Sequence, residues 1–205
     1  MARRLAPLNL VVLSALFLSL ALVGTTPAQA QAAGPAVVSV FGKAGSLLVH
    51  AWVVVPPGAD ANAVAADALA SRGARRISST EFTTEGLNWP QFSDSNPGND
   101  YVAQYYNPAS DPTGGGGGTA LTNAEHTWTA VTSSRFVFQY SGTTSRCPSL
   151  VSECRGAQYL DGYNDVAWMP LGGCCTLGVT WFSTSGHEAD MALNTNFSWS
   201  TSACL

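Results

Sequence analysis

Residues 161–199 have the sequence DGYNDVAWMPLGGCCTLGVTWFSTSGHEADMALNTNFSW, in which three short runs are separated by turn residues. The runs NDVAW and TLGVTWF are rich in Val, Thr, Trp and Phe, and Asp-Gly, Pro-Leu-Gly-Gly and Ser-Thr-Ser-Gly flank them. Both runs are therefore predicted to be β-strands. The third run, EADMALN at residues 188–194, is short, and by propensity alone it also fits a single helical turn.

Upstream, residues 46–55 (SLLVHAWVVV) form an apolar, β-branched run that ends at Pro56 and Pro57, which predicts a buried strand. A helix is expected next, with Asp60 as its N-cap and Gly73 as its C-terminal cap. Apolar residues recur at helical spacing between these two caps, at Ala61, Val64, Ala65, Ala68 and Leu69. Residues 34–76 are thus predicted to form a small strand–helix unit.

A second helix is predicted over residues 122–134. Thr122 and Glu125 form a capping box, and Trp128 lies on an apolar face expected to pack on the sheet. The preceding PTGGGGG, residues 112–118, is predicted to be a loop, and no Lys-Ser/Thr pair follows it as a nucleotide-binding loop requires. Residues 135–142 and the aromatic run at 100–108 predict further strands. The whole pattern predicts an α+β fold with a mixed, twisted β-sheet and a helix packed on one face.

Composition narrows the class of protein. The 205 residues are 46% apolar and 11% charged with a net charge of −4, which argues against a nucleic-acid or anionic-membrane partner. Arg3 and Arg4, the apolar residues 10–23 and the Ala-Gln-Ala at 28–30 have the order of a secretory signal peptide. The apolar run is short for a membrane anchor. We expect residues 1–30 to be removed and the protein to be secreted to the extracellular space.

Five cysteines in a secreted chain indicate disulfides, and the odd count leaves one thiol without a partner. No two cysteines have the CxxC spacing of a zinc knuckle. We expect Cys147 to pair with Cys154, and one of the adjacent pair, taken as Cys175, to pair with Cys204.

The ordered motifs DGxNDVxW, TLGVTW and EADMALN followed by a Trp resemble the first half of the catalytic domain of matrixin-like zinc metallopeptidases, which are metzincins. The likeness covers residues 89–199. It implies a pro-segment or N-terminal extension at 31–76 and, at 77–205, a peptidase domain that is incomplete at its C-terminus. In this family EADMALN is an edge strand on which an extended peptide substrate pairs. The resemblance therefore implies Ala189, Met191 and Leu193 as substrate-binding residues.

The family's chemistry uses a zinc ion held by HExxHxxGxxH, with the Glu as general base, directly after the matched segment. This sequence has no such motif, and no catalytic residue is assigned. His50, His126 and His187 lack the spacing of paired zinc ligands and are predicted to be surface or packing residues. By this resemblance we expect a metalloendopeptidase whose sequence is truncated before the zinc helix. We expect the 205-residue chain to be inactive.

The resemblance also implies a calcium site formed by Asp165, Gly186, Glu188 and Asp190. The alternative for the three acids is turn capping. A second function is also open, that of a secreted non-catalytic module that binds a peptide or glycan. Without the zinc helix, four apolar side chains are expected to lack cover and to promote self-association: Val166, Trp168, Val179 and Trp181.

Overall fold

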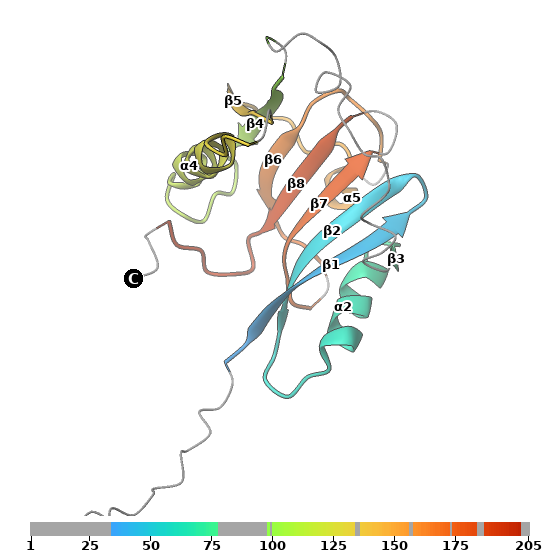
Figure 1. Cartoon of the computed structure of the whole chain (residues 1–205). Coiled ribbons are helices and arrows are strands. Elements are labelled where there is room, and N and C mark those ends of the chain that lie inside the picture. Colours follow the sequence, from blue (N-terminus) through green and yellow to red (C-terminus); the bar gives the residue numbers. More distant parts are fainter. Residues whose placement is uncertain are drawn as a thin grey trace, which may run out of the picture. The chain divides into compact units, whose positions relative to one another are not determined.

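A computed structural model describes residues 34–77, 98, 100–133, 136–155, 158–172, 174–183 and 187–201. Residues 34–205 form one compact unit. The described part contains an eight-stranded mixed sheet in the order β3-β1-β2-β7-β8-β6-β4-β5, together with helices (Figure 1). The predicted α+β class is therefore confirmed. No helix in the described part of the chain is long and apolar enough to span a membrane.

The N-terminal strands form a hairpin, β1 (Ala36–Ala44) and β2 (Leu47–Val55), whose turn uses the left-handed conformation of Gly45. Strand β2 confirms the prediction for residues 46–55, whereas β1 was not predicted. On its other side β2 pairs antiparallel with β7 (Thr176–Ser183), so this hairpin belongs to the same sheet as the C-terminal strands. The short β3 (Arg75–Arg76) pairs with β1 at the sheet edge.

Helix α2 (Ala61–Ala70) begins and ends where its caps predict. The side chain of Asp60 accepts a hydrogen bond from the Asn62 amide at 2.9 Å, and Gly73 is left-handed with φ of 64° just after the helix. Ala65, Ala68 and Leu69 are buried against β1 and β2.

The remaining strands are β4 (Val102–Asn107), β5 (Phe138–Thr143), β6 (Asp165–Met169) and β8 (Ala189–Asn194). Strand β8 pairs in parallel with β6 and antiparallel with β7. It is therefore an inner strand, and the expectation that EADMALN is an edge strand was wrong. The alternating pattern of the run fits an edge strand or an inner strand, and only its pairing with both β6 and β7 fixes its place.

Helix α4 (Gly117–Thr129) begins five residues before the predicted start at Thr122. Asp111 Oδ2 accepts a hydrogen bond from the Gly117 amide at 3.1 Å. It therefore satisfies one of the N–H groups that have no partner within the first turn of the helix. Thr122 lies inside the helix, where its hydroxyl donates to the Gly118 carbonyl, so the predicted capping box does not form. Trp128 is 66% exposed, so the expectation that it packs on the sheet was wrong.

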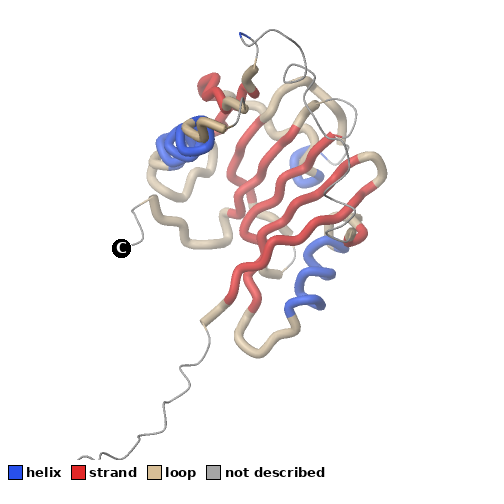
Figure 2. The backbone as a smooth tube through the Cα atoms, in the orientation of Figure 1, coloured by secondary structure: helices blue, strands red, loops and turns tan. Residues whose placement is uncertain are grey.

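The two faces of the sheet carry different clusters because side chains alternate along each strand. Helix α2 and the loop containing Leu150 and Val151 cover one face, called here the α2 face, where Val179 and Trp181 are fully buried. On the opposite α4 face, Leu121 and Trp199 pack against Val166 and Trp168. Figure 2 shows the two longer helices lying toward opposite ends of the sheet.

The four side chains expected to lack cover are therefore buried. Trp168, the most exposed of them, is only 6% exposed. The expectation was wrong because it assumed that only residues after Leu205 could cover these side chains. Helices α2 and α4 and the loops cover them instead. A groove remains open on the α4 face, and other residues line it.

Candidate functional site

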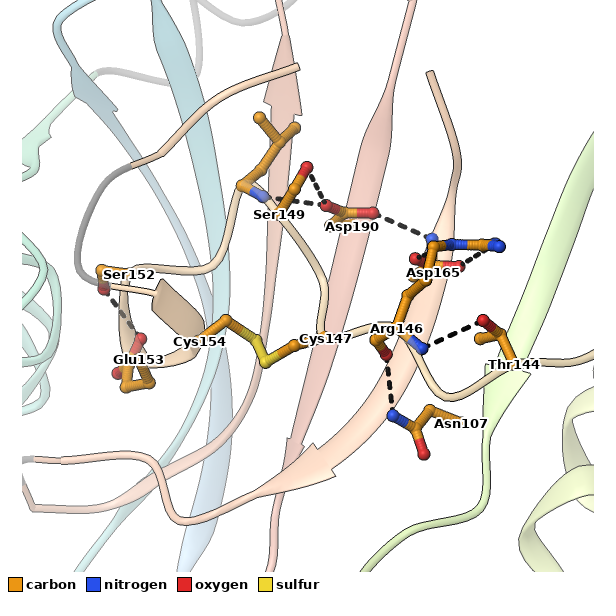
Figure 3. Close-up of a disulfide and its surroundings, with 11 residues drawn as sticks. Asn107, Thr144, Arg146, Cys147, Ser149, Ser152, Glu153, Cys154, Asp165 and Asp190 are labelled. Carbon is orange, nitrogen blue, oxygen red and sulfur yellow. Dashed lines mark hydrogen bonds and ion pairs between the residues drawn. A yellow bond between two sulfur atoms is a disulfide. The ribbon is translucent and has the colours of Figure 1, made fainter. Parts of the chain in front are cut away.

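The three candidate metal-binding acids lie where β6 and β8 begin. Asp165 is 0% exposed and accepts two hydrogen bonds from Arg146, from Nε to Oδ2 at 2.9 Å and from Nη2 to Oδ1 at 2.8 Å (Figure 3). This bidentate pair occupies both carboxylate oxygens with a cation. The hydrogen bond to Asp165 raises the pKa of Arg146 further, so the guanidinium keeps its charge.

Asp190 is also 0% exposed and joins two segments of backbone. Its Oδ1 accepts the amide hydrogen of Asp165 at 2.8 Å, and its Oδ2 accepts that of Leu150 at 2.9 Å. Burial raises the pKa of Asp190 to about 7, although these two hydrogen bonds favour the ionised form. Asp190 thereby fixes the Leu150 loop on the α2 face of the sheet (Figure 3).

Glu188 has the same role at the next turn. Its Oε2 accepts the amide hydrogens of Asp161 and Gly162, and its Oε1 accepts the Ser149 hydroxyl hydrogen at 3.0 Å. Burial raises the pKa of Glu188 as well. The fourth candidate, Gly186, lies outside the described residues.

These contacts do not fit a metal site. The oxygens of all three acids already accept hydrogen bonds, and in the described part of the chain no group of three His, Cys, Asp or Glu side chains is arranged to hold a metal ion. The contacts favour the turn-capping alternative over the calcium site that the family resemblance implies, and calcium titration tests which of the two holds. His50, His126 and His187 lie on β2, on α4 and just before β8, and none of them belongs to a group of three potential ligands among the described residues.

Nothing in the sequence pattern identified Arg146 as part of this site. Its guanidinium lies over the rings of Tyr105 and Tyr163, with its carbon 4.6 and 3.8 Å from the two ring centroids, and it is enclosed between them and Asp165. No sequence signal joins Arg146 to an acid 19 positions away. The arrangement serves structure, because it anchors the segment that leads into the first disulfide.

The expected disulfide between Cys147 and Cys154 is confirmed, with 5.6 Å between the two Cα atoms. It closes the loop that Asp190 and Glu188 bind through Leu150 and Ser149. Figure 3 shows the disulfide together with Ser149 and Asp190. The covalent bond and the buried acids therefore hold the same loop.

The expected pairing of Cys175 with Cys204 was wrong, because Cys175 is bonded to its neighbour Cys174. The carbonyl of Cys175 accepts the Val54 amide hydrogen at 2.7 Å, so the pair lies at the end of the β2–β7 ladder. Cys204 is outside the described residues.

An open groove of about 550 Å³ lies on the α4 face, between the C-terminal end of α4 and strand β2. Strand pairing places a row of side chains across its floor, because register matches His50 to Thr180 and Thr180 to Met191. Two of the three predicted substrate-binding residues, Ala189 and Met191, line it, while Leu193 packs in the cluster around Trp168. The aromatic lining comes from several elements: Trp52, Trp128, Phe136, Phe138 and Phe182.

The described lining of the groove lacks charge. Among the lining residues that the structure describes, none is Asp, Glu, Lys or Arg, and burial lowers the pKa of His50 to about 4, so this imidazole is neutral at physiological pH. Its Nε2 bonds the Ser39 hydroxyl at 2.6 Å, and its ring stacks on Phe41 at 4.1 Å between centroids. Thr180, opposite His50, is 5% exposed, and its hydroxyl has no hydrogen-bond partner in the described part of the protein.

A second hollow of about 560 Å³ lies beside the start of α4 and is lined partly by Tyr106 and Asp111. These groups are already bonded: Tyr106 donates to Asp111 at 2.8 Å and accepts from the Trp168 indole at 2.6 Å. Burial raises the pKa of Tyr106 to about 12, so its hydroxyl keeps its proton. This cluster fixes the beginning of α4, and the first groove is the better candidate for binding.

In comparisons with known proteins, no family profile, no curated protein and no solved structure matches this chain. The metzincin resemblance therefore rests on the sequence motifs alone.

Proposed function

We propose that this chain is the sheet portion of a secreted matrixin-like metalloendopeptidase, and that by itself it binds peptides without cleaving them. The observation that carries the proposal is the uncharged aromatic groove, which contains Ala189 and Met191 from the matched EADMALN motif. Concave, mostly apolar sites of about 300 to 1,000 Å³ are where proteins usually bind ligands. The leader-like N-terminus and the two disulfides support secretion.

The family reaction is attack of a zinc-activated water on a peptide carbonyl, with a glutamate as base. The residues of this chain do not fit that zinc site, because HExxHxxGxxH is absent from the sequence and the three histidines lie apart. Cleavage would require zinc ligands from outside these 205 residues. Binding is therefore the step that we assign to this chain.

The mode of peptide binding differs from the family expectation. Strand β8 is paired on both sides, and β2 occupies the free side of β7, so neither strand offers an open edge to a peptide. A peptide can instead insert side chains into the groove, whose floor is the outer surface of these strands.

A glycan-binding module is the competing proposal. Sugar recognition needs several free hydrogen-bonding groups beside an aromatic surface, whereas here Asn164 is already bonded to Ala103 and Ala189. The groove lining has few other polar side chains and therefore favours apolar peptide side chains.

Immobilised protein incubated with a tryptic digest of casein tests the proposal. The wild type should retain a subset of peptides, and Met191→Glu should release them because it places a charge on the groove floor. Trp128→Ala, at an exposed position that tolerates truncation, should weaken retention. Val37→Glu, at an exposed position of β1 outside the groove, is the control and should leave retention unchanged. Equal retention by all four proteins would contradict a binding role for the groove.

A further inference from the structure

We propose that the second hollow, of about 560 Å³ beside the start of α4, binds the ring of a neutral saccharide. Its described lining residues are all different from those of the peptide groove. Figure 1 shows α4 beside β5, and these two elements supply most of the polar side chains of the hollow. A saccharide site here goes beyond the proposed peptide binding and stands without it.

The hollow has hydrogen-bonding side chains that a ligand can reach from solvent. Thr119 and Asn123 lie one helical turn apart at exposed positions of α4, and Thr143 is exposed at the end of β5. In the part of the chain that the structure describes, these three side chains have no hydrogen-bond partner. Hydroxyl and carboxamide groups both donate and accept hydrogen bonds, as the hydroxyl groups around a sugar ring do.

An apolar wall lies beside these polar groups. Tyr140 is half-buried, and its ring packs against the cluster around Trp168, which holds it in place where it lines the hollow. The exposed ring of Pro108 continues the wall. A sugar ring has an apolar C–H face as well as hydroxyl groups, and this face packs well on an aromatic side chain. One saccharide ring can therefore use both kinds of surface at once.

The charge of Asp111 favours a neutral ligand over an anion. The start of a helix commonly attracts an anion, but here Asp111 Oδ2 already accepts the Gly117 amide hydrogen at 3.1 Å. Burial opposes the charge, yet hydrogen bonds from Thr113, Tyr106 and Gly117 lower the pKa of the Asp111 carboxyl, so it is ionised at neutral pH. A phosphate or a sugar carboxylate in the hollow would therefore meet a like charge.

Saturation-transfer-difference NMR of the whole protein tests the site, with the methyl glycosides of glucose, galactose, mannose and N-acetylglucosamine as probes. At least one of these neutral glycosides should receive saturation, and glucuronate and inorganic phosphate should not displace it. Thr119→Ala and Asn123→Ala should each weaken its binding about two- to tenfold, the range of one net hydrogen bond. Thr132→Ala, at an exposed position just after α4 and outside the hollow, is the matched control and should leave binding unchanged.

Three results would overturn the saccharide site. They are no saturation of any neutral glycoside, equal binding by the wild type and a variant with both Thr119→Ala and Asn123→Ala, or displacement by inorganic phosphate. Both side chains are exposed, so the amide spectrum of the double variant should stay that of a folded protein. Trp128→Ala, in the peptide groove, should leave glycoside binding unchanged, so the saccharide site and the peptide groove can fail independently.

Discussion

At the scale of single residues, the buried acids act as backbone clamps. Asp190 joins the start of β6 to the Leu150 loop, and Glu188 joins Ser149 to the turn at Asp161. Each hydrogen bond to a charged acceptor contributes roughly 1.5–3 kcal/mol, and burial opposes the charge that accepts it. The balance between these effects depends on pH.

Asp190 should lower the free energy of unfolding as pH rises from about 4 to about 7, because burial raises its pKa to about 7. In this window the folded protein keeps a proton on Asp190 that the unfolded chain has released, and Glu188, whose pKa is also raised, contributes in the same direction. His50, whose pKa burial lowers to about 4, contributes in the opposite direction, so the test compares variants. Urea unfolding at several pH values measures the slope of stability against pH. Asp190→Asn should make this slope more positive than in the wild type, whereas Asp67→Asn, at an exposed position of α2, should leave it unchanged; equal slopes for the wild type and Asp190→Asn contradict the assignment.

Calcium should leave the melting temperature unchanged, because hydrogen-bond donors already occupy Asp165, Glu188 and Asp190. A calcium ion bound only by the folded state would add roughly 2.7 kcal/mol at about 100 times its Kd. Thermal melts with and without calcium, on wild type and Asp190→Ala, measure this. A calcium-dependent rise in the wild type that Asp190→Ala abolishes would restore the family site.

At the scale of elements, α4 shows how tertiary contacts set a helix boundary. Two glycines in its first turn are poor helix formers, yet the helix begins there because Asp111 binds the Gly117 amide. The close approach also needs a glycine: a Cβ on Gly117 would lie 2.2 Å from the Tyr106 hydroxyl oxygen and 3.1 Å from the Trp168 indole nitrogen.

Gly117→Ala should therefore lower the unfolding free energy by roughly 1–2 kcal/mol, because overpacking exceeds the gain in helix propensity. Gly118→Ala is the matched control, since its nearest neighbours would be Tyr106 ring carbons at 3.3 and 3.4 Å. This change should be close to neutral. Denaturant melts of both variants compare them, and equal effects would show that the Tyr106 contact does not govern the start of α4.

At the scale of the whole molecule, local signals predicted β2, α2, β6 and β7 because each has its pattern and its turns in one stretch. The pairing of β2 with β7 joins segments more than a hundred residues apart, and the inner position of β8 depends on its pairing with both β6 and β7. The groove was not predicted for the same reason: β2, β4, β7, β8 and α4 all contribute to it. Of the groove residues, only Ala189 and Met191 were predicted to bind a ligand, and that prediction came from the family resemblance.

The same groove should make the protein self-associate at high concentration, because its uncharged aromatic lining can bury apolar area against a second copy. Size-exclusion chromatography with light scattering over a range of concentrations measures this. Met191→Glu should shift the protein toward monomer and reduce binding of a hydrophobic dye, with Val37→Glu as the control. A wild type that stays monomeric and dye-silent at all concentrations contradicts this expectation.

The proposed function has this chain bind peptide without supplying zinc chemistry. Purified protein is dialysed with zinc, its bound metal is determined, and the same sample is incubated with casein while mass spectrometry follows the peptides. We expect no stoichiometric zinc and intact casein, since the chain has no HExxHxxGxxH. One tightly held zinc per chain with chelator-sensitive cleavage of casein would contradict it.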